Sequence, residues 1–168
     1  MRSYTPRKRI FVDMDGVIAE FNPNATEDQL YEPGYFRTRP AEEEMLGVIR
    51  KLIEDRRNEV FILSCVLPGI FERAKAEKDA WLDEHLPEAE QWARIFIPCG
   101  TDKVDAVKLK ECLCRYDVLL DDHSPNCRTW QEHNGTAIKI LNGINGNGGS
   151  YKGIRARPDQ VLEQIEAL

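Results

Sequence analysis

Short apolar runs rich in β-branched residues alternate along most of the chain with longer stretches whose apolar positions are three or four residues apart. A continuous apolar run is typical of a buried strand, whereas the three-to-four spacing is typical of an amphipathic helix. The apolar runs predict strands over 9–12, 59–64, 94–97, 117–120 and 136–141. The amphipathic stretches predict helices over 42–55, 70–85, 103–114, 125–133 and 158–167. Strands that alternate with helices pair in parallel through right-handed crossovers, so we expect one α/β sandwich domain over residues 1–168.

Two segments depart from this alternation. Residues 21–40 contain three prolines and several aromatic residues without a clear period, which indicates a small insertion after the first strand. Residues 142–153 are rich in Gly and Asn and predict a loop with several turns. Because only one helix follows this loop, we do not interpret it as a linker between two domains.

The composition excludes several classes of protein. Hydrophobic residues make up 42% and charged residues 31% of the 168 residues, as in a chain that folds around a core. The net charge of −6 opposes binding to nucleic acid polymers and to anionic membranes. No apolar run approaches the roughly 18 residues of a membrane span, and the first residues do not resemble a signal peptide. We therefore expect a cytoplasmic protein with a small-molecule partner, and the pattern carries no signal of the oligomeric state.

The five cysteines are odd in number and scattered along the chain. This usage favours a reducing compartment over a disulfide framework. Cys112 and Cys114 are two residues apart in a predicted helix, so their side chains would point in different directions. No second Cys or His pair lies nearby with zinc-finger spacing. We interpret the cysteines as packing thiols.

The strongest chemical signal is a pair of carboxylates at the end of the first predicted strand. Asp13 and Asp15 directly follow the apolar residues 10–12, and Gly16 permits a sharp turn. Ligands of open parallel sheets bind beyond the carboxyl ends of the strands, where these two groups would lie. The same Asp-x-Asp-Gly pattern occurs in plain turns and in calcium loops, so by itself it leaves the function open.

A second acidic pair, Asp121 and Asp122, directly follows another apolar strand. The carboxyl ends of parallel strands meet at one edge of a sheet, and carboxylates held together are costly unless a cation neutralises them. A ligand set of oxygens suits Mg²⁺. Ser64 ends a third strand and Lys103 begins a helix, and both side chains could bind phosphate oxygens. Taken alone, a serine at this position is more often just the residue that ends a strand, and a lysine at the start of a helix is more often a solvated charge.

With these residues in order, the chain resembles the haloacid dehalogenase-like (HAD) superfamily of aspartyl-phosphate hydrolases over nearly its whole length. The resemblance implies a three-layer Rossmann-like parallel sheet with a small cap inserted at about 21–40. It implies that Asp13 is the nucleophile, and that Asp15 protonates the leaving oxygen and then activates water. Mg²⁺ would be held by Asp13, the backbone carbonyl of Asp15 and a carboxylate of the 121–122 pair. Ser64 and Lys103 would bind the transferring phosphoryl group.

The segment Asp-Met-Asp-Gly-Val-Ile-Ala-Glu-Phe over 13–21 is similar to the 5′(3′)-deoxyribonucleotidase group of that superfamily. In this group a lysine at the position of Lys78 contacts phosphate, and cap aromatics, here Phe21 and Phe36, surround the base. Tyr35 is equally suitable, because a nucleobase stacks on aromatic faces. The alternatives are aromatic residues that only pack the cap onto the core, and a Lys78 that is solvated on its helix.

The resemblance therefore implies a Mg²⁺-dependent phosphomonoesterase, and within that class a 5′-nucleotidase for nucleoside monophosphates. Two alternatives stay open, a phosphatase for another small ester such as a sugar phosphate and a catalytically silent binding domain of the same fold. The stretch between Lys103 and Asp121 is longer than in typical members, which leaves Lys108 and Lys110 as further candidates for the phosphate contact. Whether Asp121 or Asp122 binds the metal directly is also open.

Overall fold

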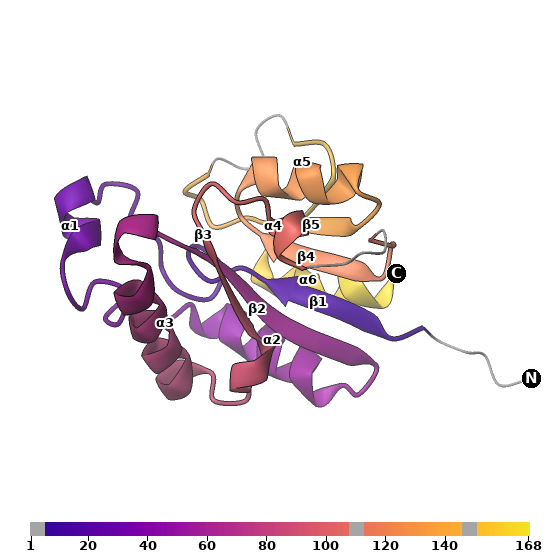
Figure 1. Cartoon of the computed structure of the whole chain (residues 1–168). Helices are drawn as coiled ribbons and strands as arrows, with labels where there is room; N and C mark the ends of the chain where they lie inside the picture. Colours follow the sequence, from indigo (N-terminus) through magenta and orange to yellow (C-terminus); the bar gives the residue numbers. More distant parts are fainter. Residues whose placement is uncertain (1–5, 108–112, 146–150) are drawn as a thin grey trace, which may run out of the picture.

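The computed structural model describes residues 6–107, 113–145 and 151–168, and its centre is a six-stranded parallel sheet (Figure 1). The strands lie in the order β3-β2-β1-β4-β5-β6. Their bounds are β1 Lys8–Val12, β2 Asn58–Val66, β3 Arg94–Pro98, β4 Asp117–Asp121, β5 Thr136–Ile140 and β6 Ile154–Ala156. Because β1 pairs with both β2 and β4, the strand that carries the first acidic motif is central. The expected α/β architecture with a Rossmann-like parallel sheet is confirmed.

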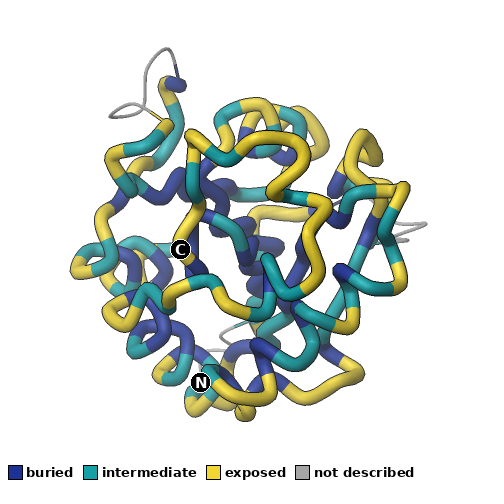
Figure 2. Tube along the Cα trace, turned by 90° about the vertical axis from the view of Figure 1, so that its left-hand side faces the viewer, coloured by how far each residue is buried: buried dark blue, intermediate teal, exposed yellow. Residues whose placement is uncertain are grey.

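Helices cover both faces of the sheet, which makes three layers. They are α1 Glu27–Tyr31, α2 Glu43–Glu54, α3 Phe71–His85, α4 Lys103–Ala106, α5 Ser124–Glu132 and α6 Pro158–Glu166, with short 3₁₀ turns at Pro68–Ile70 and Gln91–Ala93. Ile10 and Val12 of β1 face a core shared with α2, α3 and α6, whereas Phe11 faces the core shared with α5. Successive strand residues point to opposite faces, so a strand buried on both sides consists of consecutive apolar residues. Figure 2 shows buried positions in the interior and exposed positions along the outer loops.

The five predicted strands are confirmed with shifts of one or two residues at their ends, but the structure has a sixth, β6. The helix predicted over 103–114 is wrong in its extent, because α4 ends at Ala106 and Val107 caps it. Residues 113–116 are not helical, and Lys108, Lys110 and Cys112 lie outside the described residues. In the described part of the chain, no helix is both long enough and apolar enough to cross a membrane.

The cysteines do not all pack in the interior. Cys127 is fully buried in the core beside α5, as expected of a packing thiol. Cys99 and Cys114 are exposed and Cys65 is half-buried, so the packing interpretation is wrong for Cys99 and Cys114. Cys99 follows the end of β3, where its backbone N–H donates to the carbonyl of Val66 at 2.8 Å.

The insertion between β1 and α2 is fastened to the core at its base and along one side. A β-bridge pairs Ala19 with Ala41, where the segment leaves and rejoins the core. The Glu77 carboxylate of α3 accepts hydrogen bonds from the backbone N–H groups of Gly34 (2.8 Å) and Phe36 (3.1 Å). Helix α1 in this segment stands apart from the sheet on the side toward which β1 points (Figure 1). The insertion thus lies beside the carboxyl end of the central strand.

Candidate active site

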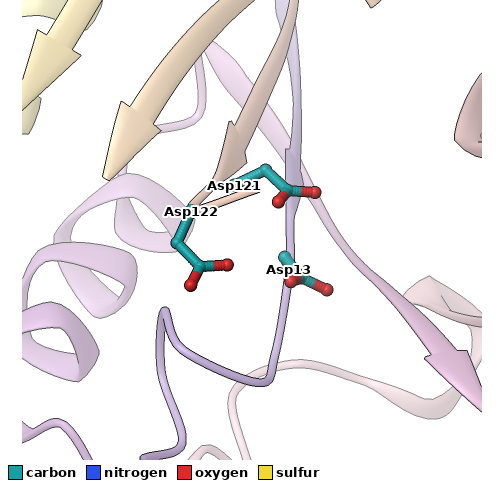
Figure 3. Close-up of side chains that lie close together, drawn as sticks. All are labelled: Asp13, Asp121 and Asp122. Atoms are coloured by element: carbon teal, nitrogen blue, oxygen red, sulfur yellow. The ribbon is translucent and has the colours of Figure 1, made fainter. Parts of the chain in front are cut away.

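Three carboxylates meet at the carboxyl ends of the two central strands. Asp13 follows β1, Asp121 ends β4 and Asp122 comes next. The Asp13 backbone N–H donates to the carbonyl of Leu120 at 2.9 Å, which aligns the two strand ends. One carboxylate oxygen from each Asp lies within 4.8 Å of the others, all three residues are buried, and Figure 3 shows the Asp122 carboxylate turned toward Asp13. The sequence prediction that the two acidic pairs share one edge of the sheet agrees with this arrangement.

Lys103 lies between two of these carboxylates. Its Nζ is 2.8 Å from Asp13 Oδ1 and 2.7 Å from Asp121 Oδ2, and only 2% of the residue is exposed. Burial disfavours the ammonium, but Asp121 and Asp13 together raise the pKa of Lys103 above its ordinary value. Burial also raises the pKa of Asp13 to about 7, because Lys103 offsets only part of the desolvation and the charges of Asp121 and Asp15 add to it. Lys103 therefore neutralises Asp13 and Asp121 only in part, and it makes no contact with Asp122.

Asp121 and Asp122 differ in how their oxygens are used. Asp121 Oδ1 accepts from the backbone N–H of His123 at 2.8 Å, and Oδ2 accepts from Asn126 at 2.9 Å as well as from Lys103. The side chains of Asn142 and Asn145 both donate to Asp122 Oδ2, at 2.7 and 2.5 Å. Burial and the neighbouring Asp121 nevertheless raise the pKa of Asp122. Both oxygens of Asp121 accept hydrogen bonds from protein donors. At Asp122, the two asparagine side chains contact Oδ2 and not Oδ1.

Gly16 makes the close approach of the first motif to Asp122 feasible. Its φ of +84° lies in the left-handed region that favours glycine. A Cβ at this position would collide with the Asp122 carboxylate. The carbonyl of Gly16 accepts from Asn142 Nδ2 at 2.9 Å, so one asparagine ties the first turn to the second acidic pair.

Lys78 of α3 connects the first motif to β2. Its ammonium is fully buried and contacts the Asp15 carboxylate, Ser64 Oγ at 2.8 Å and the backbone carbonyl of Cys65 at 2.9 Å. The Phe36 ring from the insertion lies 5.0 Å from the ammonium, as in a cation–π contact. The interpretation of Lys78 as a solvated helix charge is wrong. The sequence placed it on the buried face of α3, because it lies four residues from both Ala74 and Leu82.

Asp15 lies where the cavities of this edge meet. A main cleft of about 440 Å³ is lined by Asp13, Asp15 and Lys103, and a neighbouring hollow of about 330 Å³ contains Asp13, Asp15, Asp122 and Phe21. A smaller cavity of about 140 Å³, which we call the cap cavity, joins Asp15 to residues of the insertion, Phe21, Tyr35, Phe36 and Arg39 among them. A cavity of about 590 Å³ at the opposite ends of the strands has none of these acids in its lining. Within the described part of the chain, the structure thus brings the predicted site residues to one edge of the sheet, with Ser64 in contact with Lys78.

Sequence reasoning missed the polar residues that hold the acids in place. Asn142 and Asn145 lie in the segment that we expected to be only a turn-rich loop, and Asn126 lies in α5. Glu77, which holds the insertion, is next to Lys78 in the sequence. The available signal for the asparagines was a cluster of amide side chains directly after β5, the strand that neighbours β4.

The acidic cluster is chemically suited to Mg²⁺. Its donors are carboxylate oxygens, which are the ligands this ion prefers. Burial raises the pKa of Asp13 and of Asp122, and the Lys103 ammonium offsets this only in part at Asp13. A divalent cation beside Asp13 and Asp122 would supply further positive charge.

Comparison with solved structures shows the fold. D,D-heptose 1,7-bisphosphate phosphatase from B. bronchiseptica, complexed with magnesium and phosphate, has a TM-score of 0.65 and 15% identity, covering 94% of this chain and 99% of that one. A HAD family hydrolase from Deinococcus radiodurans R1, with bound phosphate and sodium, has a TM-score of 0.59 and 12% identity, covering 97% and 98%. A putative HAD-like phosphatase from Mesorhizobium loti has a TM-score of 0.58 and 16% identity, covering 99% and 88%.

No curated protein matches the chain. A family model described as "5' nucleotidase, deoxy (Pyrimidine), cytosolic type C protein" matches residues 22–157, which is well over half of the sequence. The expectation of a phosphoric monoester hydrolase is confirmed at this level. The chain therefore belongs to the deoxy (pyrimidine) 5′-nucleotidase, cytosolic type C family, within the HAD-like hydrolases.

Proposed function

We propose that this protein hydrolyses the phosphate group of nucleoside monophosphates with a single pyrimidine ring, using Mg²⁺ and an aspartyl-phosphate intermediate. The observation that carries the proposal is the position of Asp15, which lines both the main cleft beside Asp13 and the aromatic cap cavity. A phosphate in the cleft would have its ester oxygen toward the cavity that takes the rest of the substrate. The cytosolic description of the family supports the expected cytoplasmic location.

In this proposal Mg²⁺ is held by Asp13, Asp122 and the backbone carbonyl of Asp15. The unequal use of the two acids supports Asp122 over Asp121, since both Asp121 oxygens already accept hydrogen bonds from the protein. When bound, the ion neutralises phosphoryl charge and lowers the repulsion between that group and the carboxylates. Lys103 favours the ionised form of Asp13, against the effect of burial, and orients it at 2.8 Å.

The chain's own residues would carry both half-reactions. An Asp13 carboxylate oxygen attacks phosphorus, the bond from phosphorus to the ester oxygen breaks, and Asp15 donates its proton to the departing alkoxide. A water then attacks the phosphorus of the aspartyl phosphate, Asp15 takes up the proton, and inorganic phosphate leaves with Asp13 regenerated. Lys78 orients Asp15 through its contact with the carboxylate, and Ser64 Oγ in turn holds the Lys78 ammonium by accepting a hydrogen bond from it at 2.8 Å.

The cap cavity supports a nucleobase over a sugar. Phe21, Tyr35 and Phe36 line it, and aromatic faces stack on flat rings. Its volume of about 140 Å³ is far below that of sites for large ligands, which favours a pyrimidine over a purine. Among the described residues the Tyr35 hydroxyl and Arg39 Nε are buried without a hydrogen-bond partner. Buried polar groups are normally satisfied, so these two atoms fit the carbonyl groups of a pyrimidine.

The test compares kcat/KM for pyrimidine and purine 5′-monophosphates, sugar phosphates and glycerol 2-phosphate, each with Mg²⁺ and with chelator. We expect pyrimidine nucleotides to be the best substrates and chelator to abolish turnover. Arg39→Met should lower kcat/KM for pyrimidine nucleotides by about tenfold, the equivalent of one hydrogen bond from a charged donor. It should leave kcat/KM for glycerol 2-phosphate unchanged.

Arg37→Met is the matched control, because Arg37 lies in the same segment but pairs with Glu84 and does not line the cap cavity. It should change kcat/KM neither for pyrimidine nucleotides nor for glycerol 2-phosphate. A preference for sugar phosphates, or an equal loss of all substrates in Arg39→Met, would overturn the nucleotidase proposal while leaving the phosphatase assignment in place.

A further inference from the structure

Two cysteines stand side by side where the main cleft meets the cap cavity. Cys65 is on β2 directly after Ser64, and Cys99 follows the end of the neighbouring strand β3. Both residues line the main cleft together with Asp13 and Asp15, and both also line the cap cavity together with Phe36. Cys99 is exposed and Cys65 is half-buried, so the pair is accessible from the same space as the substrate.

A hydrogen bond from the Cys65 thiol to the Cys99 sulfur is the largest influence on the pKa of both groups. This bond favours the thiolate of Cys99 and, with the nearby Lys78 ammonium, lowers the pKa of Cys99 to about 7 against the opposing effect of burial. The same bond, together with burial, raises the pKa of Cys65. By contrast, burial raises the pKa of Cys127 in the core. Cys99 is therefore the nucleophilic thiol of the pair, and Cys65 is the hydrogen-bond donor that supports it.

We propose that Cys99 is a covalent modification site for small-molecule disulfides, and that its adduct closes the active-site cleft. The Cys99 thiolate attacks one sulfur of R–S–S–R and forms a new bond to it, which gives Cys99–S–S–R. The sulfur–sulfur bond of the reagent breaks, and R–S⁻ leaves with its electron pair. The disulfide is the oxidant, so no other co-reactant is required. A thiol reverses the step by attack on the mixed disulfide.

The position of Cys99 makes the adduct inhibitory. The group R would extend into space lined by Asp15 and Lys103 on one side and by Phe36 on the other. A substrate needs the same space for its phosphate and for the group attached to it. The loss of turnover rests on the proposed function of this site, whereas formation of the adduct depends on the thiol pair alone.

The experiment treats the full chain with oxidised glutathione at pH 7 and follows intact mass, peptide mass and hydrolysis of a phosphate ester. We expect one glutathione adduct on Cys99, loss of turnover in step with the adduct, slower modification in the presence of inorganic phosphate, and full recovery with dithiothreitol. Cys99→Ser should keep its activity after treatment. Cys114→Ser is the matched control, since Cys114 is exposed but does not line the cleft, and it should lose activity as the unsubstituted chain does.

Cys65→Ala tests the role of the hydrogen-bond donor. Without it the Cys99 thiolate should form nearer the ordinary pKa of about 8.5, so the pH at half-maximal modification rate should rise by about one unit. The rate at pH 7 should fall by only about threefold, because a more basic thiolate is also more nucleophilic.

An adduct confined to Cys114, or an adduct on Cys99 that leaves turnover intact, would overturn the proposal. Inactivation of Cys99→Ser at the rate of the unsubstituted chain would overturn it as well. If the chain hydrolysed no phosphate ester at all, the mass measurement would still decide whether Cys99 is the modified thiol.

Discussion

The buried nucleophile makes the stability of the metal-free protein depend on pH in a direction that can be worked out. The pKa of Asp13 rises from its ordinary value of 3.8 to about 7 in the folded chain, chiefly because of burial. Between these two values the folded state holds a proton that the unfolded state releases, so stability falls as pH rises. Each pH unit in this window costs about 1.4 kcal/mol, and the full change is about 4 kcal/mol between pH 4 and pH 7.

Urea denaturation in chelator at pH 4, 5, 6, 7 and 8 measures this loss, and Asp13→Asn isolates it. The amide has nearly the same shape, cannot ionise and still offers Oδ1 to Lys103, which lies 2.8 Å away in the folded chain. The free energy of unfolding of the unsubstituted chain should fall relative to the variant by a few kcal/mol from pH 4 to pH 8. Excess Mg²⁺ at pH 8 should restore the unsubstituted chain but not the variant. Parallel pH curves for the two proteins would refute the assigned burial of charge at Asp13.

Three further substitutions test other contacts. Lys103→Met leaves two buried carboxylates without their ammonium, so we expect loss of turnover and about 3 to 5 kcal/mol less stability by urea denaturation; retained kinetics would refute its role. The methyl group of Gly16→Ala would displace the Asp122 carboxylate, so the Mg²⁺ concentration for half-maximal activity should rise at least tenfold. An unchanged Mg²⁺ requirement in kinetics at varied Mg²⁺ would contradict this. Gly135→Ala brings a methyl group into Trp130, so thermal melting should show a loss of about 1 to 3 kcal/mol with kcat/KM unchanged.

The sequence predicted the sheet well, since its strands are consecutive apolar residues that need no further information. It failed where elements are short or depend on contacts. Strand β6 has three residues, of which Arg155 is exposed, and this is too short to show a period. The pattern over 103–114 continues a helical spacing beyond Ala106, but Val107 ends the helix in the structure. Such ends depend on tertiary packing that local spacing does not contain.

At the site, sequence order located the acids but not their partners. Asp13 and Asp121 were predictable because the carboxyl ends of parallel strands share an edge. Lys78 and Asn145 depend on how α3 and the loop after β5 pack against that edge. A lysine in an amphipathic helix is usually solvated, and here Asp15 and the buried Ser64 reverse that expectation by providing oxygen partners.

The bridge between Ala19 and Ala41 has a consequence for how this family could diversify. It brings the two ends of the insertion next to each other. The connection to the core therefore stays the same whatever the number of residues between these two ends. Lengthening a loop with fixed ends adds little entropic cost, about 0.6 kcal/mol for each doubling. The segment could therefore be exchanged between relatives as a graft. The acids on the core would be kept, and the preference for the group attached to the phosphate would change. Glu77 suits such a graft, because it binds backbone N–H groups, which any inserted segment carries.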